Sequence, residues 1–360
     1  MAKPDGKNIL VIRYRFIGDT ILTVPFLRDL RVAYPQAKID VLTGPRSGEV
    51  LEGCPYVDEL ICFDTTRFHK YDSGVGKPRT FFSYVKELRA RRYDLVFVLK
   101  RSFSAALLAY LSGAKRRVGY SKKGRNWLLT DSVLWRQDIH EVDSLLSVLR
   151  AVNIEAAGTG AGTQVDSWVT ASELAAVKQI EPSLEIPGPK VLIHAAAAHP
   201  DKLYPLEHWA TLVKKLAKLG FTPVFSGDKQ DVPLYEQLAQ LSEVPALNFA
   251  GKLTLRQSMA LYSLMDLAVC VDSGPSHLAA AAGVPTIALF GPTDPVRWGP
   301  YGERNRAVFD DTLTCRPCNY KKVCDNRPCL TELSPDLIFD RCLEVLKYIQ
   351  DKEERDVSGT

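Results

Sequence analysis

Short apolar runs alternate with helix-like spacing along most of this chain, and the clearest example lies near the end of its third quarter. Residues 267–271 and 286–290 are two apolar runs, each of the length of a buried strand. Between them, the Ala-rich segment 276–282 predicts a helix that is closed by Gly283 and Pro285. The pattern therefore predicts a β-α-β crossover in a parallel sheet.

Polar and flexible residues gather where the first of these strands meets the helix. They are Asp272, Ser273, Gly274 and His277. In an open α/β sheet the carboxyl edge of the strands binds ligands, and a helix N-terminus attracts anions. A second interpretation is that Asp272 or Ser273 only caps the helix. An acid, a hydroxyl, a glycine and an imidazole within six residues are more than capping requires, and we expect a binding site.

The same alternation fills both halves of the chain. It predicts strands at 8–13, 38–43, 59–63, 95–99 and 117–120, and again at 190–195, 223–226, 267–271 and 286–290; the helices between them include 47–51, 81–90, 102–111, 205–219 and 232–241. Such alternation predicts an α/β fold of two Rossmann-like, doubly wound domains facing each other across a cleft. The Gly- and Ala-rich segment 155–162 is the expected linker. We place the domains at 1–165 and 166–340, followed by a helix and charged tail at 341–360.

An acidic residue also follows the first predicted strand. The turn after residues 8–13 contains Gly18 and Asp19, and helical spacing resumes around Pro25, which should mark where the regular helix begins. A position close to a helix start favours a carboxylate. Asp19 is thus either a cap or a functional acid.

Composition and charge narrow the classes of function. The chain has 360 residues, 46% of them hydrophobic and 24% charged, with a net charge of +4. That charge is too small to indicate nucleic-acid binding, and the chain shows neither an apolar leader nor an apolar stretch long enough to span a bilayer, so we expect a cytoplasmic protein. Basic residues cluster at 114–125. This cluster is either a solvated face or a surface that attracts anions such as acidic lipid headgroups.

Two more features carry chemistry in the second half. Lys202 lies in the loop after the strand 190–195, where a flexible cation can reach a phosphate. Before the final predicted helix stand four cysteines, Cys315, Cys318, Cys324 and Cys329. Metal binding, disulfides and free thiols all stay open for them, and we expect a structural clip lying away from both sites.

Four segments together resemble one known family. ILVIRYRFIGDTILTVPFLRDLRVAYP, RRYDLVFVLK, KLYPLEHWATL and VDSGPSHLAAAAGVPTIALFGPTDP are similar to segments of the ADP-heptose:lipopolysaccharide heptosyltransferases, glycosyltransferase family 9. The likeness extends from about residue 8 to 346, and it implies the GT-B type of two-domain fold.

The resemblance also implies an activity and a set of site residues. The family transfers a heptose, with inversion, from a nucleoside diphosphate sugar to a lipopolysaccharide core, and the acid of its first Gly-Asp loop is the general base. In this chain the base would be Asp19, beside Gly18 on the acceptor-side loop, and the residues that contact the nucleotide sugar would be Lys202, Asp272, Ser273, Gly274 and His277.

Cofactors and partners follow from the same resemblance. No cofactor is required, and a divalent cation is not indicated because the chain has no Asp-x-Asp pair. The partners would be a nucleoside diphosphate sugar, an anionic glycolipid acceptor and the cytoplasmic face of the inner membrane. A nucleotide-sugar epimerase and a non-catalytic nucleotide-binding protein are the alternatives; neither would release nucleotide in response to an acceptor.

Overall fold

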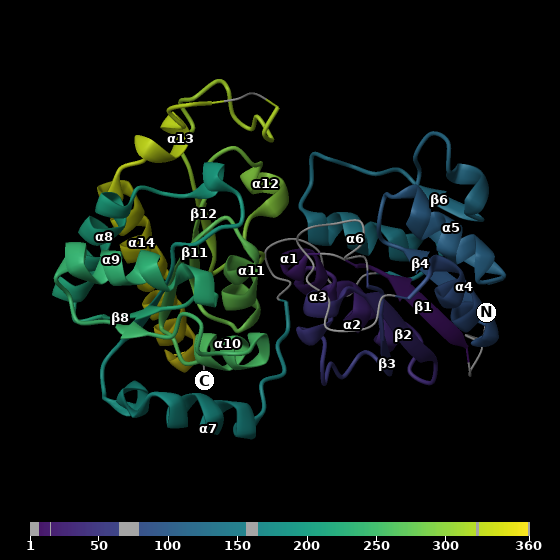
Figure 1. The fold of residues 1–360 in the computed structure, drawn as a ribbon, viewed down its shortest axis with the longest axis horizontal. Coiled ribbons are helices and arrows are strands. Elements are labelled where there is room, and N and C mark those ends of the chain that lie inside the picture. Colours follow the sequence, from purple (N-terminus) through teal and green to yellow (C-terminus); the bar gives the residue numbers. More distant parts are fainter. Residues whose placement is uncertain (1–6, 15, 65–78, 156–164, 322–323, 359–360) are drawn as a thin grey trace. The chain divides into compact units, whose positions relative to one another are not determined.

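The computed structural model describes residues 7–14, 16–64, 79–155, 165–321 and 324–358. The chain divides into two compact units, residues 1–163 (unit 1) and 164–360 (unit 2), and Figure 1 shows that each unit consists of a sheet and helices. Apart from Glu155, the predicted linker lies outside the described residues. Our domain limits at 165 and 340 remain predictions.

Among the described residues, unit 1 contains one six-stranded parallel sheet in the order β3-β2-β1-β4-β5-β6. Its strands are β1 (Asn8–Ile12), β2 (Lys38–Thr43), β3 (Glu59–Cys62), β4 (Leu95–Val98), β5 (Arg116–Tyr120) and β6 (Asp131–Val133). Its helices are α1 (Ile17–Ile21), α2 (Val24–Ala33), α3 (Pro45–Glu49), α4 (Phe81–Ala90), α5 (Phe103–Leu111) and α6 (Glu141–Arg150), with a short 3-10 turn, η1 (Asn126–Leu128).

Unit 2 repeats this plan, with a six-stranded parallel sheet in the order β12-β11-β10-β7-β8-β9 among its described residues. The strands are β7 (Lys190–His194), β8 (Thr222–Phe225), β9 (Leu247–Asn248), β10 (Leu267–Val271), β11 (Thr286–Leu289) and β12 (Arg306–Val308). The longer helices are α7 (Ala171–Ile180), α8 (Leu206–Lys218), α9 (Val232–Ser242), α10 (Leu255–Tyr262), α11 (Gly274–Ala281) and α14 (Pro335–Ser358); the shorter ones are η2 (Pro182–Glu185), η3 (Pro200–Lys202), η4 (Lys229–Asp231), α12 (Pro295–Trp298) and α13 (Pro328–Thr331).

Both sheets reverse their winding direction at one point. In unit 1 the two strands at this switch point are β1 and β4, and in unit 2 they are β7 and β10. In doubly wound sheets the connections leave these two strands in opposite directions, and ligands bind in the crevice that this creates outside the carboxyl ends of the strands. Each unit therefore has one position where a site is expected.

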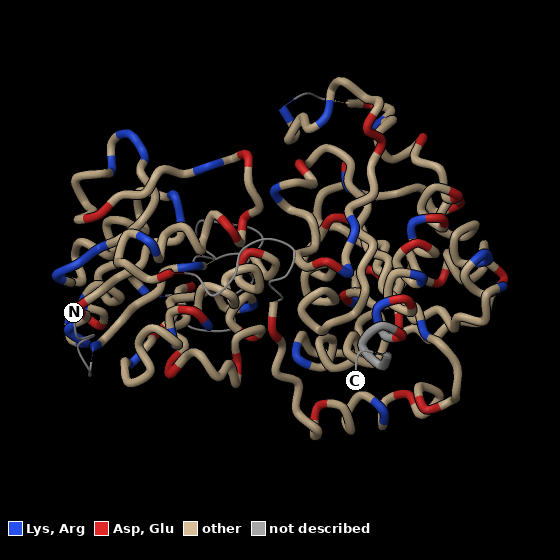
Figure 2. Tube along the Cα trace, turned by 180° about the vertical axis from the view of Figure 1, so that it is seen from behind, with Lys and Arg blue, Asp and Glu red and all other residues tan. Residues whose placement is uncertain are grey.

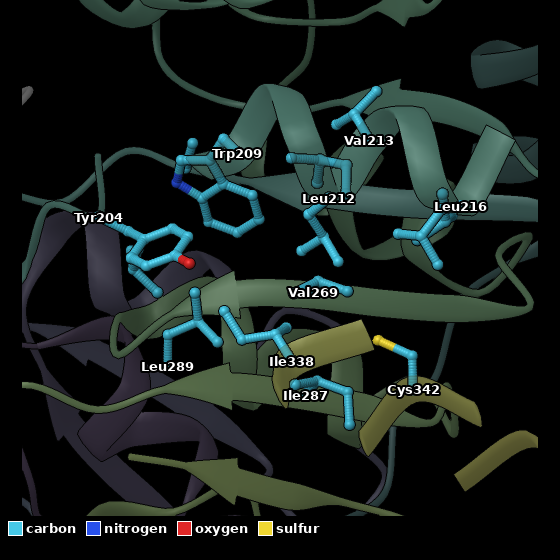
Figure 3. Close-up of a cluster of buried hydrophobic side chains, with 14 of the residues drawn as sticks. Tyr204, Trp209, Leu212, Val213, Leu216, Val269, Ile287, Leu289, Ile338 and Cys342 are labelled. Atoms are coloured by element: carbon cyan, nitrogen blue, oxygen red, sulfur yellow. The ribbon is translucent and has the colours of Figure 1, made fainter. Parts of the chain in front are cut away.

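The core of unit 2 shows why its sheet is stable. Helices α8 and α14 pack together, α8 also contacts β8, and α14 contacts β11 and β12. Figure 3 shows side chains of both helices gathered with those of β10 and β11 in one buried cluster. Trp209 is completely buried, and its truncation to alanine would cost about 3–5 kcal/mol. Tyr204 is also buried, and its hydroxyl donates to the Leu333 carbonyl oxygen at 2.7 Å. Tyr204 is thus a core residue.

The predicted fold class is confirmed. The predicted and observed elements differ only at some helix limits and at short edge strands. The strands predicted at 38–43 and 267–271 and the helix at 81–90 have the predicted limits. The helix after β10 begins at Gly274 rather than at residue 276, and α3 lies two residues before its predicted position. Three edge strands were missed, namely β6, β9 and β12. They are only two or three residues long and have no continuous apolar run, because an edge strand has one free side.

Candidate active site

An ion pair occupies the switch point of unit 2. Lys202, in η3 after β7, places its Nζ 2.7 Å from Oδ2 of Asp272, which follows β10. The Thr293 hydroxyl, from the loop after β11, donates to the same carboxylate oxygen. The Asp272 side chain is only 6% exposed and the Lys202 side chain 20%. Three loops from neighbouring strands thus converge on one buried carboxylate, and the lysine remains accessible to a ligand.

The helix that follows Asp272 has no side-chain cap. Ser273 is the N-cap residue of α11, but its side chain makes no capping hydrogen bond, and its hydroxyl donates to the Val271 carbonyl oxygen at 3.2 Å. The interpretation of Asp272 or Ser273 as a cap is therefore wrong. Gly274 is the first residue of α11 and His277, in the same helix, is buried. All four residues after β10 lie at one sheet edge, as predicted.

The cysteine-containing segment 315–329 packs against the loops of this site, and our expectation that it lies away from the sites is wrong. Arg316 Nε donates to the Gly291 carbonyl oxygen at 2.6 Å, and the Asn319 backbone N–H donates to the Pro292 carbonyl oxygen at 2.8 Å. Gly291 and Pro292 directly precede Thr293, the hydroxyl partner of Asp272. One end of the segment therefore fixes the loop after β11.

The other contacts of the same segment reach the loop that carries Lys202. Arg327 Nη1 donates to the Pro200 carbonyl oxygen at 2.5 Å, and it lies 3.5 Å from the Leu203 carbonyl oxygen. The Tyr320 ring lies against the His199 ring, with a centroid distance of 4.3 Å. Burial, together with the nearby Asp272 and Asp201 carboxylates, raises the pKa of Tyr320, so its phenol is neutral. The segment thus contacts the loop that carries Lys202 as well as the loop that carries Thr293, and both of these residues bind the Asp272 carboxylate.

The four cysteines of this segment are thiols in the structure and form no disulfide. Cys329 is buried, Cys318 is half-buried, and Cys315 and Cys324 are exposed. Burial raises the pKa of the Cys329 thiol, although the Arg316 guanidinium opposes this effect. Within the described residues, no group of three or more His, Cys, Asp or Glu side chains is arranged to hold a metal ion.

Unit 1 places an acid and a buried cation at its own switch point. Asp19 is the third residue of α1, whose N-cap is Phe16, and in the described residues no side chain caps this helix. The interpretation of Asp19 as a cap is therefore wrong. Oδ1 of Asp19 lies 3.5 Å from Nη2 of Arg13, and the Asp19 side chain is 25% exposed. Gly18, the residue before Asp19, is buried in the same short helix.

Arg13 links this acid to the rest of unit 1. Its Nη2 lies 2.8 Å from Oε1 of Glu141, in the first turn of α6, and its Nη1 donates to the Leu99 carbonyl oxygen at 2.6 Å. Burial opposes the positive charge of Arg13, but the Asp19 and Glu141 carboxylates outweigh this effect and raise its pKa. Sequence reasoning missed Arg13 as the partner of Asp19, and Glu141 as the partner of Arg13. The sequence feature that could have indicated Arg13 is its position at the end of the predicted apolar strand 8–13.

A buried histidine ends the first strand of unit 2. His194 Nδ1 lies 3.4 Å from the Ser226 hydroxyl, which is 2.6 Å from the Tyr262 hydroxyl. The residue is 7% exposed, and burial lowers the pKa of His194 to about 4. The imidazole is therefore neutral near pH 7. Sequence reasoning included His194 only as part of a strand.

The basic cluster at 114–125 is mostly structural. Arg125 is 1% exposed, and its guanidinium donates to the carbonyl oxygens of Lys100, Ser102 and Tyr120. Arg116 pairs with Asp131 at 2.9 Å. Figure 2 shows basic and acidic residues interspersed along both units. Two arginines of the cluster thus have structural roles, whereas Lys122 and Lys123 are exposed, and the choice between a solvated face and an anion-attracting surface stays open for them.

None of the helices in the described residues combines the length and the apolar character that crossing a bilayer requires.

Comparison with known proteins gives one family. Residues 81–329 match the family model described as glycosyltransferase family 9 (heptosyltransferase). Lipopolysaccharide heptosyltransferase 3 of Escherichia coli is 29% identical over 302 residues, which cover 80% of this chain and 84% of the relative. Lipopolysaccharide heptosyltransferase 2 of Salmonella typhimurium is 29% identical over 313 residues, covering 84% and 87%.

Solved structures share the fold. The crystal structure of a family 9 glycosyltransferase from Veillonella parvula is 23% identical, with a TM-score of 0.84 over 96% of this chain and 99% of that one. Escherichia coli ADP-heptose lipopolysaccharide heptosyltransferase II is 24% identical, with a TM-score of 0.74 over 95% and 99%.

Proposed function

The chain belongs to glycosyltransferase family 9, the heptosyltransferases, and on this premise we propose that it transfers a heptose, with inversion, from an ADP-heptose-type donor to a lipopolysaccharide core acceptor. The observation that carries the proposal is the Lys202–Asp272 ion pair at the switch point of unit 2, in which the carboxylate is buried and the lysine accessible. Relatives named as lipopolysaccharide heptosyltransferases, similar over most of their length, support the donor and the acceptor.

The donor would bind at the carboxyl edge of the unit 2 sheet. Lys202 would contact the diphosphate as a point charge, and Ser273, Gly274 and His277 would complete the phosphate site at the start of α11. Asp272 cannot attract a phosphate, because both carry negative charge. Its role would be to hold the lysine ammonium in place beside the diphosphate.

The acceptor hydroxyl would lose its proton to Asp19. As the O–H bond breaks, the oxygen attacks the anomeric carbon, the bond to the diphosphate breaks, and ADP leaves with that electron pair. This single displacement inverts the anomeric centre. Arg13 would support the carboxylate without taking its proton, since Arg13 is held by Glu141 at 2.8 Å and lies farther, 3.5 Å, from Asp19.

We also propose that no metal is required. The ammonium of Lys202 and the start of α11 would offset the charge that develops on the departing diphosphate, which is the task of a divalent cation in other transferases. A chelator should then leave the rate unchanged. A rate restored only by added Mg²⁺ or Mn²⁺ would overturn this part of the proposal.

The acceptor suggests where the protein works. An anionic glycolipid core lies at a membrane surface, and we propose that the protein works in the cytoplasm as a peripheral protein on the inner face of the inner membrane.

Donor turnover with and without acceptor tests the function. We expect ADP release from ADP-heptose to depend on a lipopolysaccharide core acceptor. Acceptor-independent conversion of the donor would favour an epimerase, and binding of ADP without turnover would favour a non-catalytic protein.

A further inference from the structure

Helix α5 of unit 1 is apolar on both of its faces. Its inner face packs on the sheet through Ala105, Ala106, Leu108 and Ala109, all of them buried. Its outer face presents Phe103, which is 50% exposed, Tyr110, which is 44% exposed, and the half-buried Leu107 between them. A helix that is apolar all round is normally buried on all sides. The outer face of α5 therefore needs an explanation.

A third aromatic side chain extends this face. Trp127, in η1, is 64% exposed, and its ring lies edge-on to the Tyr110 ring with a centroid distance of 5.8 Å. Together Phe103, Leu107, Tyr110 and Trp127 form one exposed apolar surface, which we call the aromatic surface. Contiguous exposed apolar side chains mark interaction sites, whereas scattered ones do not.

Two lysines are held close to the aromatic surface. Lys122 and Lys123 are exposed in the loop between β5 and η1, and neither forms an ion pair with a described residue. The loop is fixed by the buried Arg125, whose Nη1 donates to the Ser102 carbonyl oxygen at 2.9 Å. Ser102 is the N-cap of α5, directly before Phe103. Positive charge is thus anchored beside the first residue of the aromatic surface.

We propose that the aromatic surface and Lys122–Lys123 dock this protein on a bilayer that contains anionic lipids. Tryptophan and tyrosine have an apolar ring with a polar edge and suit the interface between headgroups and acyl chains. Lysines beside them are attracted to anionic headgroups, by about 1 kcal/mol each. The proposal rests on the proposed function, because it gives the membrane contact of an enzyme with a glycolipid acceptor a defined location.

The test is cosedimentation of the full chain with two kinds of vesicle. One contains phosphatidylcholine alone, and in the other about a quarter of the lipid is phosphatidylglycerol. We expect binding to the anionic vesicles and little to the neutral ones. Trp127→Ser and Phe103→Ser should each lower the partition coefficient about threefold to tenfold. Lys122→Glu combined with Lys123→Glu should lower it more than tenfold, since about 1 kcal/mol per lysine corresponds to about fivefold each.

Matched controls lie in unit 2. Ile186→Ser removes an equally exposed apolar side chain (62%), and Lys218→Glu reverses an exposed lysine on α8; neither should change vesicle binding. All variants should turn over a lipid-free core acceptor at the parental rate, which separates this proposal from the proposed function. Equal vesicle binding by the aromatic-surface variants would overturn the proposal. So would self-association of the parent that Trp127→Ser abolishes, because the surface would then join two copies of the chain.

Discussion

The switch points of the two sheets place the same pair of charges in different surroundings. In unit 2, Asp272 is 6% exposed and its Oδ2 lies 2.7 Å from the Lys202 ammonium, with the Thr293 hydroxyl on the same oxygen. In unit 1, Asp19 is 25% exposed and lies 3.5 Å from Arg13. Arg13 instead makes its short contact, at 2.8 Å, with Glu141.

This difference indicates which carboxylate can do chemistry. A general base must accept a proton from a substrate, so it needs an oxygen that a hydroxyl can approach. Asp19 meets this requirement because Arg13 makes its short ion pair with Glu141 and lies farther from the Asp19 carboxylate. Asp272 does not, since its carboxylate is buried and already paired. We conclude that equal strand-edge positions support different roles because their hydrogen-bond partners differ.

The first prediction has the largest expected effect and tests Asp19. Asp19→Asn keeps the shape of the side chain but removes the base, so turnover should fall by about two to four decades. Nucleotide affinity should stay within a few-fold, as measured by calorimetric titration with ADP. Asp272→Asn is the matched variant at the other switch point, and it should weaken ADP-heptose binding. If Asp19→Asn turns over at the parental rate, Asp19 is not the general base.

The second prediction concerns two buried basic residues at equivalent places, Arg13 directly after β1 and His194 as the last residue of β7. Arg13 is charged because two carboxylates face it, whereas His194 faces the Ser226 hydroxyl and is neutral. Burial lowers the pKa of His194 from 6.5 to about 4, so the unfolded chain binds more protons than the folded chain between these values. Stability should therefore decrease as pH falls from 6.5 to 4, by about 3 kcal/mol from this residue.

Denaturant unfolding at several pH values measures this effect. His194→Asn should lose about that much of the parental pH dependence across the window, whereas its stability near pH 7 changes less. Other groups also titrate there, so the quantity to compare is the difference between parent and variant. An unchanged pH dependence would mean that His194 is not buried as a neutral group.

Particular residues show what sequence reasoning could and could not reach. Asp272 and Lys202 were predicted because each follows an apolar strand in a doubly wound pattern, and topology alone brings such positions to one edge. Glu141 was not predicted as a partner, because its contact with Arg13 joins residues 128 positions apart. Arg125 was assigned to a basic surface because a run of basic residues in a sequence suggests exposed charge. Only the fold shows that three carbonyl oxygens surround its guanidinium.

The third prediction tests the lysine of the ion pair. Lys202→Ala should weaken ADP binding by about 1–3 kcal/mol, the cost of losing a charge-assisted contact, and should affect adenosine less. Lys229→Ala is the matched control, because Lys229 is an exposed lysine that follows β8 in the same sheet. Calorimetric titration with both ligands decides between the roles. Equal losses for ADP and adenosine would mean that Lys202 supports the loop instead of the phosphates.

The last prediction has the smallest expected effect. It concerns the contacts that hold Asp272 in a closer ion pair than the one that Asp19 forms. Arg316 and Arg327 of segment 315–329 donate to carbonyl oxygens on the loops that carry Thr293 and Lys202, the two residues that bind the Asp272 carboxylate. Removing either guanidinium should loosen one loop. Because a net hydrogen bond contributes about 0.5–1.5 kcal/mol, Arg316→Ala or Arg327→Ala should weaken ADP binding only a few-fold.

A matched control and a conservative variant separate this positioning role from general stability. Arg341→Ala removes an arginine that pairs with Glu344 on the surface of α14, and it should leave ADP affinity unchanged. Arg327→Lys retains a donor and a positive charge, so it should recover part of the lost affinity. The two loops act on the donor, whereas Asp19 lies in the other unit, so the Michaelis constant for the donor should rise with little change in turnover at saturation. If turnover at saturating donor falls instead, the segment acts on the chemical step and not through the Lys202–Asp272 pair.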